Sequence, residues 1–166
     1  MRHYLSAGPL ACSLIPLVLD QVSKRLLGLL NPTDGWSLGP LALVQATNRG
    51  LAFHLLETLP PGPLAIATQY LPASLWFFFL GFVLYRKAHD STFSALPFLL
   101  VLSGGLSNLG DHFRAGAVVD TLCLHWGERA FTFNVADLAI FVGAAWGLLA
   151  DYERFVEGRA SLRPKA

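Results

Sequence analysis

Four long apolar segments constrain the fold of this chain more than any other feature. Residues 9–30, 63–85, 93–110 and 134–155 each approach the ~20 residues that a helix needs to cross about 30 Å of hydrocarbon. Charged residues make up 14% of the 166 residues and the mean hydropathy is +0.50, whereas charged residues are about a quarter of a typical soluble domain. The sequence therefore predicts an all-α membrane protein with four transmembrane helices.

The first apolar segment is expected to be a retained helix. It continues past Asp20 to Leu30 without a small-residue cleavage site, unlike a secretory signal peptide. Cys12 lies within this segment and Cys123 in a distant polar connection, so no disulfide framework is expected. The net charge of +1, with Lys and Arg scattered at the ends of the apolar segments, gives no sign of a nucleic-acid partner.

The distribution of Lys and Arg predicts the orientation of these helices, because cytoplasmic segments carry an excess of both residues. The richer side holds Arg2, Arg86, Lys87, Arg154, Arg159, Arg163 and Lys165, and the poorer side holds Arg49, Arg114 and Arg129. We therefore expect both termini in the cytoplasm, with a basic tail over residues 158–166. Residues 1–157 are expected to form a single transmembrane domain whose outer loops span residues 31–62 and 111–133.

The two outer loops carry strand signals. Residues 36–48 contain an apolar run of strand length broken by turn residues, and residues 117–126 and 131–133 flank a turn. A small extracytoplasmic β element is therefore expected. Within the helices, the small-residue stretches Gly104-Gly105 and Gly143-Ala144-Ala145 predict close packing between helix backbones.

Asp20, Asp111, Asp120 and Asp137 lie within or beside the apolar segments, and the predicted topology places them all near the outer face. An ionisable group in hydrocarbon costs about 2.5–3.5 kcal/mol on insertion scales, so such residues are candidates for a functional site. Two carboxylates held close together cannot both ionise cheaply and share a proton instead. Such a pair is able to activate a water against a peptide carbonyl, one member accepting a proton and the other donating one.

Structural explanations exist for part of this set. Asp20 and Lys24 are four residues apart on one helical face, where they are able to form an ion pair. Asn134 is a favoured N-cap, and Asp137, three residues on, is able to return a hydrogen bond at the helix start. This explanation accounts for Asn134 but leaves a catalytic role for Asp137 open. Asp120 ends an apolar, strand-like run, which is a poor place for a solvated charge unless it points into a site.

A metal site is the competing interpretation, because several residues of the outer side are able to ligate zinc. They are Asp111, His112, Asp120, Cys123 and His125. Their spacing is irregular, with no His-x-x-x-His or Cys-x-x-Cys pattern, so neither a metal nor another cofactor is expected. A serine nucleophile is also disfavoured, because the chain has no Gly-x-Ser-x-Gly motif.

Five short motifs follow one another along the chain. They are Asp20-Gln-x-x-Lys24, Asn48-x-Gly50-x-Ala52-Phe53, Asn108-x-x-Asp111, Arg114-x-Gly116-x-Val118-x-Asp120 and Phe133-Asn134-Val135-Ala136-Asp137. Each motif is weak alone, but all five in this order on a chain with four apolar segments form a specific pattern. Over nearly its whole length the chain resembles the lipoprotein signal peptidase family, also called signal peptidase II.

The resemblance implies a bacterial inner-membrane aspartic endopeptidase with four transmembrane helices and an extracytoplasmic β-cradle, which needs no metal. Its implied substrates are prolipoproteins with diacylglycerol on a cysteine, cleaved on the amino side of that cysteine. By motif, Asp120 and Asp137 are the implied catalytic pair. The implied supporting residues are Asp20, Lys24, Asn48, Gly50, Asn108, Asp111, Arg114 and Asn134. Membrane lipids and globomycin-type inhibitory peptides are further expected partners.

Three positions depart from the family pattern. Ser107 stands where the family usually has Gly, His112 where it has Arg, and Thr121 where it has an aromatic residue. We therefore expect a divergent member. The alternative function is a non-catalytic paralogue that binds a lipidated or helical partner as a membrane scaffold or assembly factor. An ion translocator is disfavoured, because residues 63–85 and 93–110 contain no charged side chain.

Overall fold

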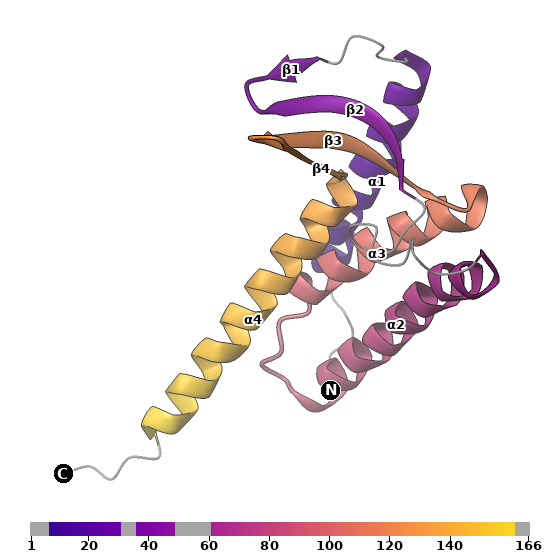
Figure 1. Ribbon diagram of the computed structural model, residues 1–166. Coiled ribbons are helices and arrows are strands. Elements are labelled where there is room, and N and C mark those ends of the chain that lie inside the picture. The colour runs from indigo at the N-terminus through magenta and orange to yellow at the C-terminus, as the bar shows by residue number, and fades with distance from the viewer. Residues whose placement is uncertain (1–6, 31–35, 49–60, 162–166) are drawn as a thin grey trace.

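The computed structural model describes residues 7–30, 36–48 and 61–161, which form helices and one small sheet (Figure 1). The elements are α1 (Ala7–Leu30), β1 (Ser37–Leu38), β2 (Leu41–Asn48), α2 (Pro61–His89), α3 (Leu96–Ala115), β3 (Val118–Trp126), β4 (Arg129–Phe133) and α4 (Val135–Ser161). The sheet lies at one end of the helices, and α4 extends away from it (Figure 1). The predicted helices and the predicted β element are therefore all present.

Two helices end later than predicted. α3 continues through Ala115 and ends where Gly116 adopts a left-handed conformation at φ 69°, with its N–H donating to the carbonyl of His112 at 2.8 Å. Residues 111–115 therefore belong to α3 and not to a loop, because Gly110 is tolerated within the helix. α4 likewise continues through Ser161, so residues 158–161, predicted as part of a tail, are helical. No proline interrupts α4 within these bounds.

The sheet has the order β1-β2-β3-β4, with every neighbouring pair antiparallel. Gly39 and Gly127 form the two hairpin turns, at φ 61° and 60°, a conformation that L-residues with a side chain rarely adopt. An irregularity between Leu43 and Ala46 of β2 shifts the register against β3, which bends the sheet. This bend carries the first residues of β3 toward the helices (Figure 1).

α3 is the central helix and packs against α1, α2 and α4. A Cβ placed on Gly104 would collide with the carbonyl oxygen of Ala136 in α4, and one on Gly143 would collide with the carbonyl of Pro97 in α3. A Cβ on Gly105 would instead meet the indole side chain of Trp76 in α2. The predicted close packing at these small residues is confirmed, and it holds the start of α4 directly against α3.

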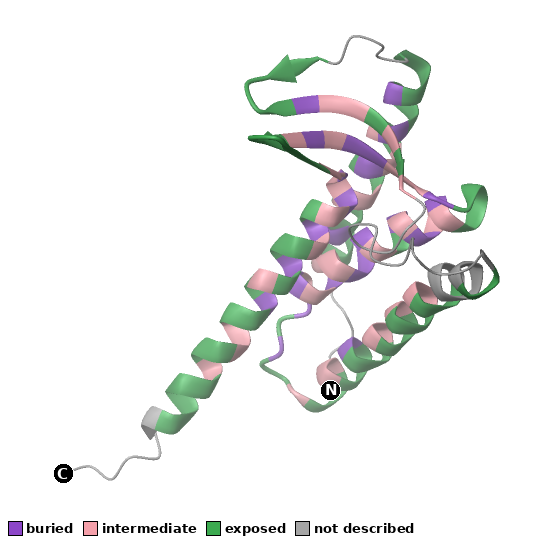
Figure 2. Ribbon diagram, in the orientation of Figure 1, coloured by how far each residue is buried: buried purple, intermediate pink, exposed green. Residues whose placement is uncertain are grey.

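Within the parts of the chain that the structure describes, one helical segment is long and apolar enough to span a membrane by length and composition. It is Val135–Arg159 of α4. Much of α4 is exposed (Figure 2), including the large apolar side chains Leu138, Phe141, Val142, Trp146, Leu148 and Leu149. A continuous apolar face of this length is suited to a lipid environment.

Candidate active site

A buried ion-pair cluster joins α1 to α3 at the end of the helices nearest the sheet. The Lys24 ammonium lies 2.6 Å from Asp20 Oδ2 and 2.5 Å from Asp111 Oδ2, and it donates to Asn108 Oδ1 at 3.2 Å. The side chain of Asp20 is fully buried, and that of Lys24 is 6% exposed. The predicted pair of Asp20 and Lys24 is thus confirmed. Two carboxylates around one ammonium lower the cost of burying these charges.

Asp20 also connects α1 to the first turn of α4. Its Oδ1 accepts a hydrogen bond at 3.0 Å from the backbone N–H of Ala136, one of the unpaired donors at the start of that helix. Its Oδ2 accepts a second hydrogen bond, from the Ser107 hydroxyl of α3, at 2.8 Å. A carboxylate at this place is also favoured by the helix dipole. Asp20 therefore fixes the start of α4 relative to α1 and α3.

Asn134 and Asp137 form a reciprocal cap at the start of α4. The backbone N–H of Asp137 donates to Asn134 Oδ1 at 2.9 Å, and the backbone N–H of Asn134 donates to Asp137 Oδ2 at 3.1 Å. This is the capping-box arrangement, with Asp in place of the usual Glu or Gln. The predicted N-cap is confirmed. The cap also fixes the direction of the Asp137 carboxylate, because one of its oxygens is held by the backbone.

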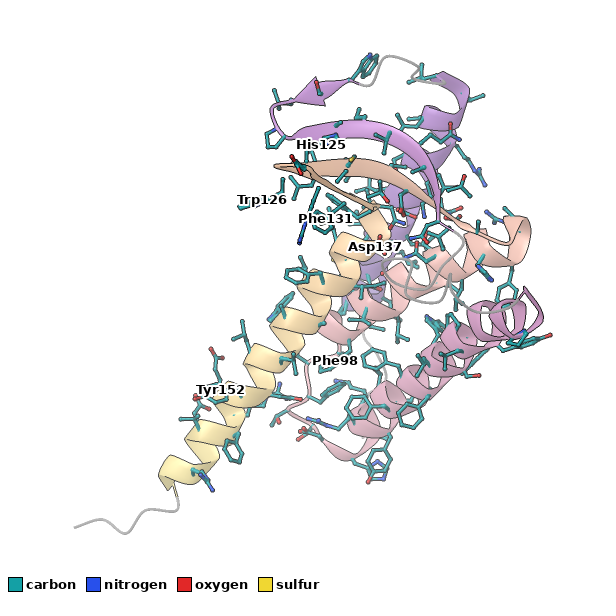
Figure 3. All side chains as sticks on the ribbon, viewed as in Figure 1. Phe98, His125, Trp126, Phe131, Asp137 and Tyr152 are labelled. Carbon is teal, nitrogen blue, oxygen red and sulfur yellow. The ribbon has the colours of Figure 1, made fainter. Side chains whose placement is uncertain are left out.

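Asp120 and Asp137 are brought together through Asn134. The Asn134 amide donates to Asp120 Oδ1 at 3.2 Å, and Asn134 is itself fully buried. Asp120 is 1% exposed, and its Oδ2 accepts from the Thr132 hydroxyl of β4 at 2.8 Å. Asn134 thus contacts both aspartates, and their carboxylates lie close enough for their charges to repel each other. Figure 3 shows Asp137 at the start of α4, below the sheet that carries Asp120.

Asn108 links this pair of aspartates to the Lys24 cluster. Its amide donates to Asp137 Oδ1 at 2.8 Å, and its carbonyl oxygen accepts from both Lys24 and the Asn134 amide, the latter at 3.1 Å. One asparagine therefore uses both ends of its side chain, which leaves it no freedom to rotate. The result is one polar network from α1 through α3 to α4 and β3.

The remaining predicted residues lie around this network. Arg114, in the last turn of α3, donates to Gln21 Oε1 at 3.0 Å, and Gln21 links it to the Lys24 cluster. Asn48 ends β2 opposite Val118, two residues before Asp120. Gly50 lies outside the described residues. Among the residues that depart from the family pattern, His112 is half-buried on α3, and Thr121 is buried without a hydrogen-bond partner for its hydroxyl among the described residues.

Sequence reasoning missed three side chains of the network. Gln21 donates to Asp111 Oδ1 at 2.8 Å and to the Ser107 hydroxyl at 3.0 Å, and Thr132 donates to Asp120. Gln21 and Ser107 were visible in or beside the motifs, but neither carried a predicted role. Nothing in the pattern distinguished Thr132 from other strand residues.

The metal ligands considered from the sequence do not gather in one place. Within residues 7–30, 36–48 and 61–161, no three His, Cys, Asp or Glu side chains are grouped closely enough to hold a metal ion. Cys123 and His125 approach to 3.5 Å between Sγ and Nε2, as neighbours on one face of β3. The aspartates instead bind hydroxyl, amide and ammonium groups. The described site is therefore a hydrogen-bonded carboxylate site.

The arrangement of helices and sheet is that of bacterial membrane enzymes. A solved bacterial membrane enzyme, determined by the in meso method at 2.3 Å, matches with a TM-score of 0.74 at 19% identity, over 99% of this chain and 97% of that chain. A second such structure, at 1.9 Å, matches with a TM-score of 0.68 at 19% identity, over 90% of this chain and 96% of that chain. These likenesses establish the fold.

The family follows from the sequence comparisons. A family model described as signal peptidase (SPase) II matches residues 12–152. The lipoprotein signal peptidase of Chlorobium phaeovibrioides is 32% identical over 156 residues, covering 86% of this chain and 89% of the relative. That of Pseudomonas fluorescens is 33% identical over 154 residues, covering 82% of each. The chain belongs to the signal peptidase II family, and it is accordingly an integral membrane protein of a protease family.

Proposed function

We propose that this protein is an aspartic endopeptidase that cleaves the signal peptide of diacylglyceryl-modified prolipoproteins on the amino side of the lipidated cysteine. The names of its relatives support the substrate class, since they are lipoprotein signal peptidases. The observation that carries the proposal is the position of Asn134, which hydrogen-bonds both Asp120 and Asp137. This asparagine connects a carboxylate of β3 to one in the first turn of α4.

The proposed reaction uses a water bound between Asp120 and Asp137. One aspartate, ionised, accepts a proton from the water as its oxygen attacks the peptide carbonyl, and the other, protonated, donates a proton to the carbonyl oxygen. As the tetrahedral intermediate collapses, the peptide C–N bond breaks, and one hydroxyl of the intermediate returns its proton to the ionised aspartate. The leaving amine takes up the proton of the other aspartate, which leaves the pair with one proton as at the start. Because the two groups are coupled, the protonation states belong to the pair and not to either residue.

The supporting residues hold this pair in place. Asn108 and Asn134 orient the carboxylate of Asp137, while Asp20, Lys24 and Asp111 fix α1 and α3 beneath it. We propose that Arg114, Asn48 and Gly50 line the adjoining path of the substrate backbone, as the family motifs imply. Hydrogen bonds already formed before the reaction lower the reorganisation that the reaction requires.

We further propose that α1, α2 and α3 cross the membrane together with α4. These helices contain 24, 29 and 20 residues, enough for the hydrocarbon core. The excess of Lys and Arg at the end opposite the sheet supports a bacterial inner-membrane topology with both termini in the cytoplasm. The active site then lies at the outer face, where the cleavage point of a membrane-inserted signal peptide emerges.

The test is cleavage of a precursor by the purified protein. A diacylglyceryl-modified prolipoprotein should yield a shortened product that begins with the lipidated cysteine, and globomycin should prevent its formation. The same precursor without diacylglycerol is the control and should remain intact. Binding of the modified precursor without cleavage would reject the proposal and favour a non-catalytic paralogue. Cleavage of both precursors alike would reject the proposed substrate class.

A further inference from the structure

Two of the metal ligands considered from the sequence remain close together. Cys123 and His125 lie two residues apart on β3, with Cys123 Sγ 3.5 Å from His125 Nε2. Successive residues of a strand project from opposite faces, so both side chains lie on the face of β3 opposite Asp120. In Figure 3, His125 lies above β3, whereas Asp137 lies below it. This pair is therefore separate from the aspartate site.

The two members of the pair differ in burial. Cys123 is 4% exposed, and its cross-strand partners are Ala42 of β2 and Thr132 of β4. Ala42 offers the sulfur no polar group, and the Thr132 hydroxyl donates to Asp120. His125, by contrast, is exposed. The imidazole is therefore the solvent-facing member of the pair, and the sulfur is the buried one.

A buried hydroxyl without a partner follows next along the same face. Thr121 is 1% exposed, and its hydroxyl has no hydrogen-bond partner among the residues that the structure describes. Such a hydroxyl costs free energy unless a water or a ligand completes it. Thr121 lies two residues before Cys123, about 7 Å along the strand. This separation accommodates one water between the hydroxyl and an ion bound to the sulfur.

The spacing and chemistry of the pair fit a soft metal ion. Metal–sulfur and metal–nitrogen bonds of about 2.3 and 2.0 Å, as in zinc sites, hold the two donor atoms about 3.5 Å apart at a tetrahedral angle. Thiolate selects soft ions such as Cu⁺ and Zn²⁺, and imidazole accepts both metals.

The buried charge and the number of ligands favour a monovalent ion. A monovalent ion on one thiolate is neutral, whereas a divalent ion leaves one positive charge uncompensated beside a buried sulfur. No third His, Cys, Asp or Glu side chain joins the pair in the described parts of the chain. Soft monovalent ions accept such low coordination numbers.

We propose that Cys123 and His125 bind one soft monovalent metal ion, Cu⁺ or its analogue Ag⁺, on the face of the sheet opposite the aspartate pair. The Cys123 thiol releases its proton to solvent as the sulfur–metal bond forms, and His125 Nε2 donates its lone pair. No oxidant or reductant is required. A water between the ion and the Thr121 hydroxyl completes the coordination. The ion takes no part in the proposed proteolysis, and the inference does not depend on that function.

The proposal is tested by calorimetric titration of silver nitrate into the full-length protein in chloride-free detergent solution, because Ag⁺ binds without changing its oxidation state. Every sample carries Cys12→Ser, since Cys12 is an exposed thiol outside the pair. Cys123→Ser and His125→Ala are each added to this background. His89→Ala is the matched control, because His89 is an exposed histidine of α2. Zinc nitrate is titrated in the same way.

We expect one Ag⁺ per chain in the Cys12→Ser background and none after Cys123→Ser. His125→Ala should weaken binding at least about tenfold, because even the groups around a metal ligand contribute that much. His89→Ala should have no effect, and Zn²⁺ should bind more weakly than Ag⁺.

Three results would overturn the proposal. Undiminished binding after His125→Ala would show that the thiol acts alone. Binding that survives Cys123→Ser, or no binding in the Cys12→Ser background, would show that the sulfur is not the ligand. Tighter binding of Zn²⁺ than of Ag⁺ would refute the assignment to a monovalent ion.

Discussion

The two ends of the helices both carry clusters of opposite charges, but the clusters differ in burial. At the sheet end, the side chains of Asp20 and Lys24 are 0% and 6% exposed, and their partners are buried with them. At the opposite end, Arg86 lies 3.3 Å from Asp151 and 3.4 Å from Asp90, and these side chains are 28–36% exposed. In Figure 2, the buried segments of α4 lie toward the sheet, and its far end is mostly exposed.

This difference indicates distinct roles for the two clusters. Ion pairs in contact with solvent contribute about 0–1 kcal/mol, and they are screened by salt. Buried charges are costly to hold, and removing one partner of a buried pair is costly too. Burying the sheet-end cluster therefore costs free energy, and stability alone does not explain why these charges are present there. Asn108 links this cluster to Asp137 and to Asn134, so under the proposed function the cluster positions the pair of Asp120 and Asp137.

The largest contrast is expected from removing the central cation of each cluster. Lys24→Met leaves Asp20 and Asp111 buried without their ammonium and should lower the free energy of unfolding by about 3–5 kcal/mol. Arg86→Met keeps much of the packing against Phe93 and should cost less than about 1 kcal/mol. Unfolding in detergent measures both. Equal losses would show that the clusters do not differ as described.

A smaller contrast is expected between two buried serines of α3. Ser107→Ala removes a hydrogen bond to the carboxylate of Asp20 and should cost about 1.5–3 kcal/mol, as for bonds to charged groups. Ser103→Ala removes only a hydrogen bond to the Leu100 carbonyl of the same helix and should cost about 1 kcal/mol or less. Thermal unfolding of the two variants is the measurement. A larger loss for Ser103→Ala would exclude Ser107 from the network.

The two ends of the helices differ in the burial of their charges, but the backbones of α3 and α4 pack equally closely at both ends. Gly104→Ala and Gly143→Ala each place a Cβ against a backbone carbonyl of the facing helix, and each should cost about 1–3 kcal/mol. Gly110→Ala, in open space on α3, should instead gain up to about 1 kcal/mol from helix propensity. Denaturant unfolding in mixed micelles compares the three. A neutral Gly104→Ala would mean that α3 and α4 lie further apart than described.

The smallest effect on stability is expected at Asp90, in the exposed Arg86 cluster opposite the sheet, and this effect depends on pH. The Thr92 hydroxyl donates to Asp90 at 2.7 Å, and this hydrogen bond holds the pKa of the Asp90 carboxyl below its ordinary value of 3.8. A lowered folded pKa means that the carboxylate stabilises the fold above 3.8 and loses this effect as the pH falls through the folded value. Asp90→Asn should therefore lower the Tm slightly at neutral pH and not at all in acid. A Tm difference that persists in acid would contradict this.

Sequence patterns predicted those features whose cause is local. The pair of Asp20 and Lys24 follows from helical spacing, and the cap of Asn134 and Asp137 follows from the start of a helix. The strands followed from apolar runs bounded by turns, at nearly the observed residues. Each of these features needs only a few neighbouring residues to be recognised.

The network itself was not predictable in this way, because its bonds join residues far apart in the chain. Gln21 reaches Asp111 because α1 packs on α3, and the N–H of Ala136 reaches Asp20 because Gly104 lets α4 pack closely on α3. The family motifs indicated which residues gather, but not which atom bonds to which. The end of α3 was placed too early because Gly110 resembles a helix end, whereas the true C-cap is Gly116.

The proposed mechanism requires Asp120 and Asp137 to act as one unit, and cleavage kinetics test this most directly. The rate on a diacylglyceryl-modified precursor is compared for Asp120→Asn, Asp137→Asn, the double variant and Asp151→Asn, a control with the same chemical change at the opposite end. We predict that each site variant loses at least about 1,000-fold, that the double variant loses no more than either, and that the control is unaffected. A single site variant that still cleaves, or losses that multiply in the double variant, would contradict the proposed mechanism.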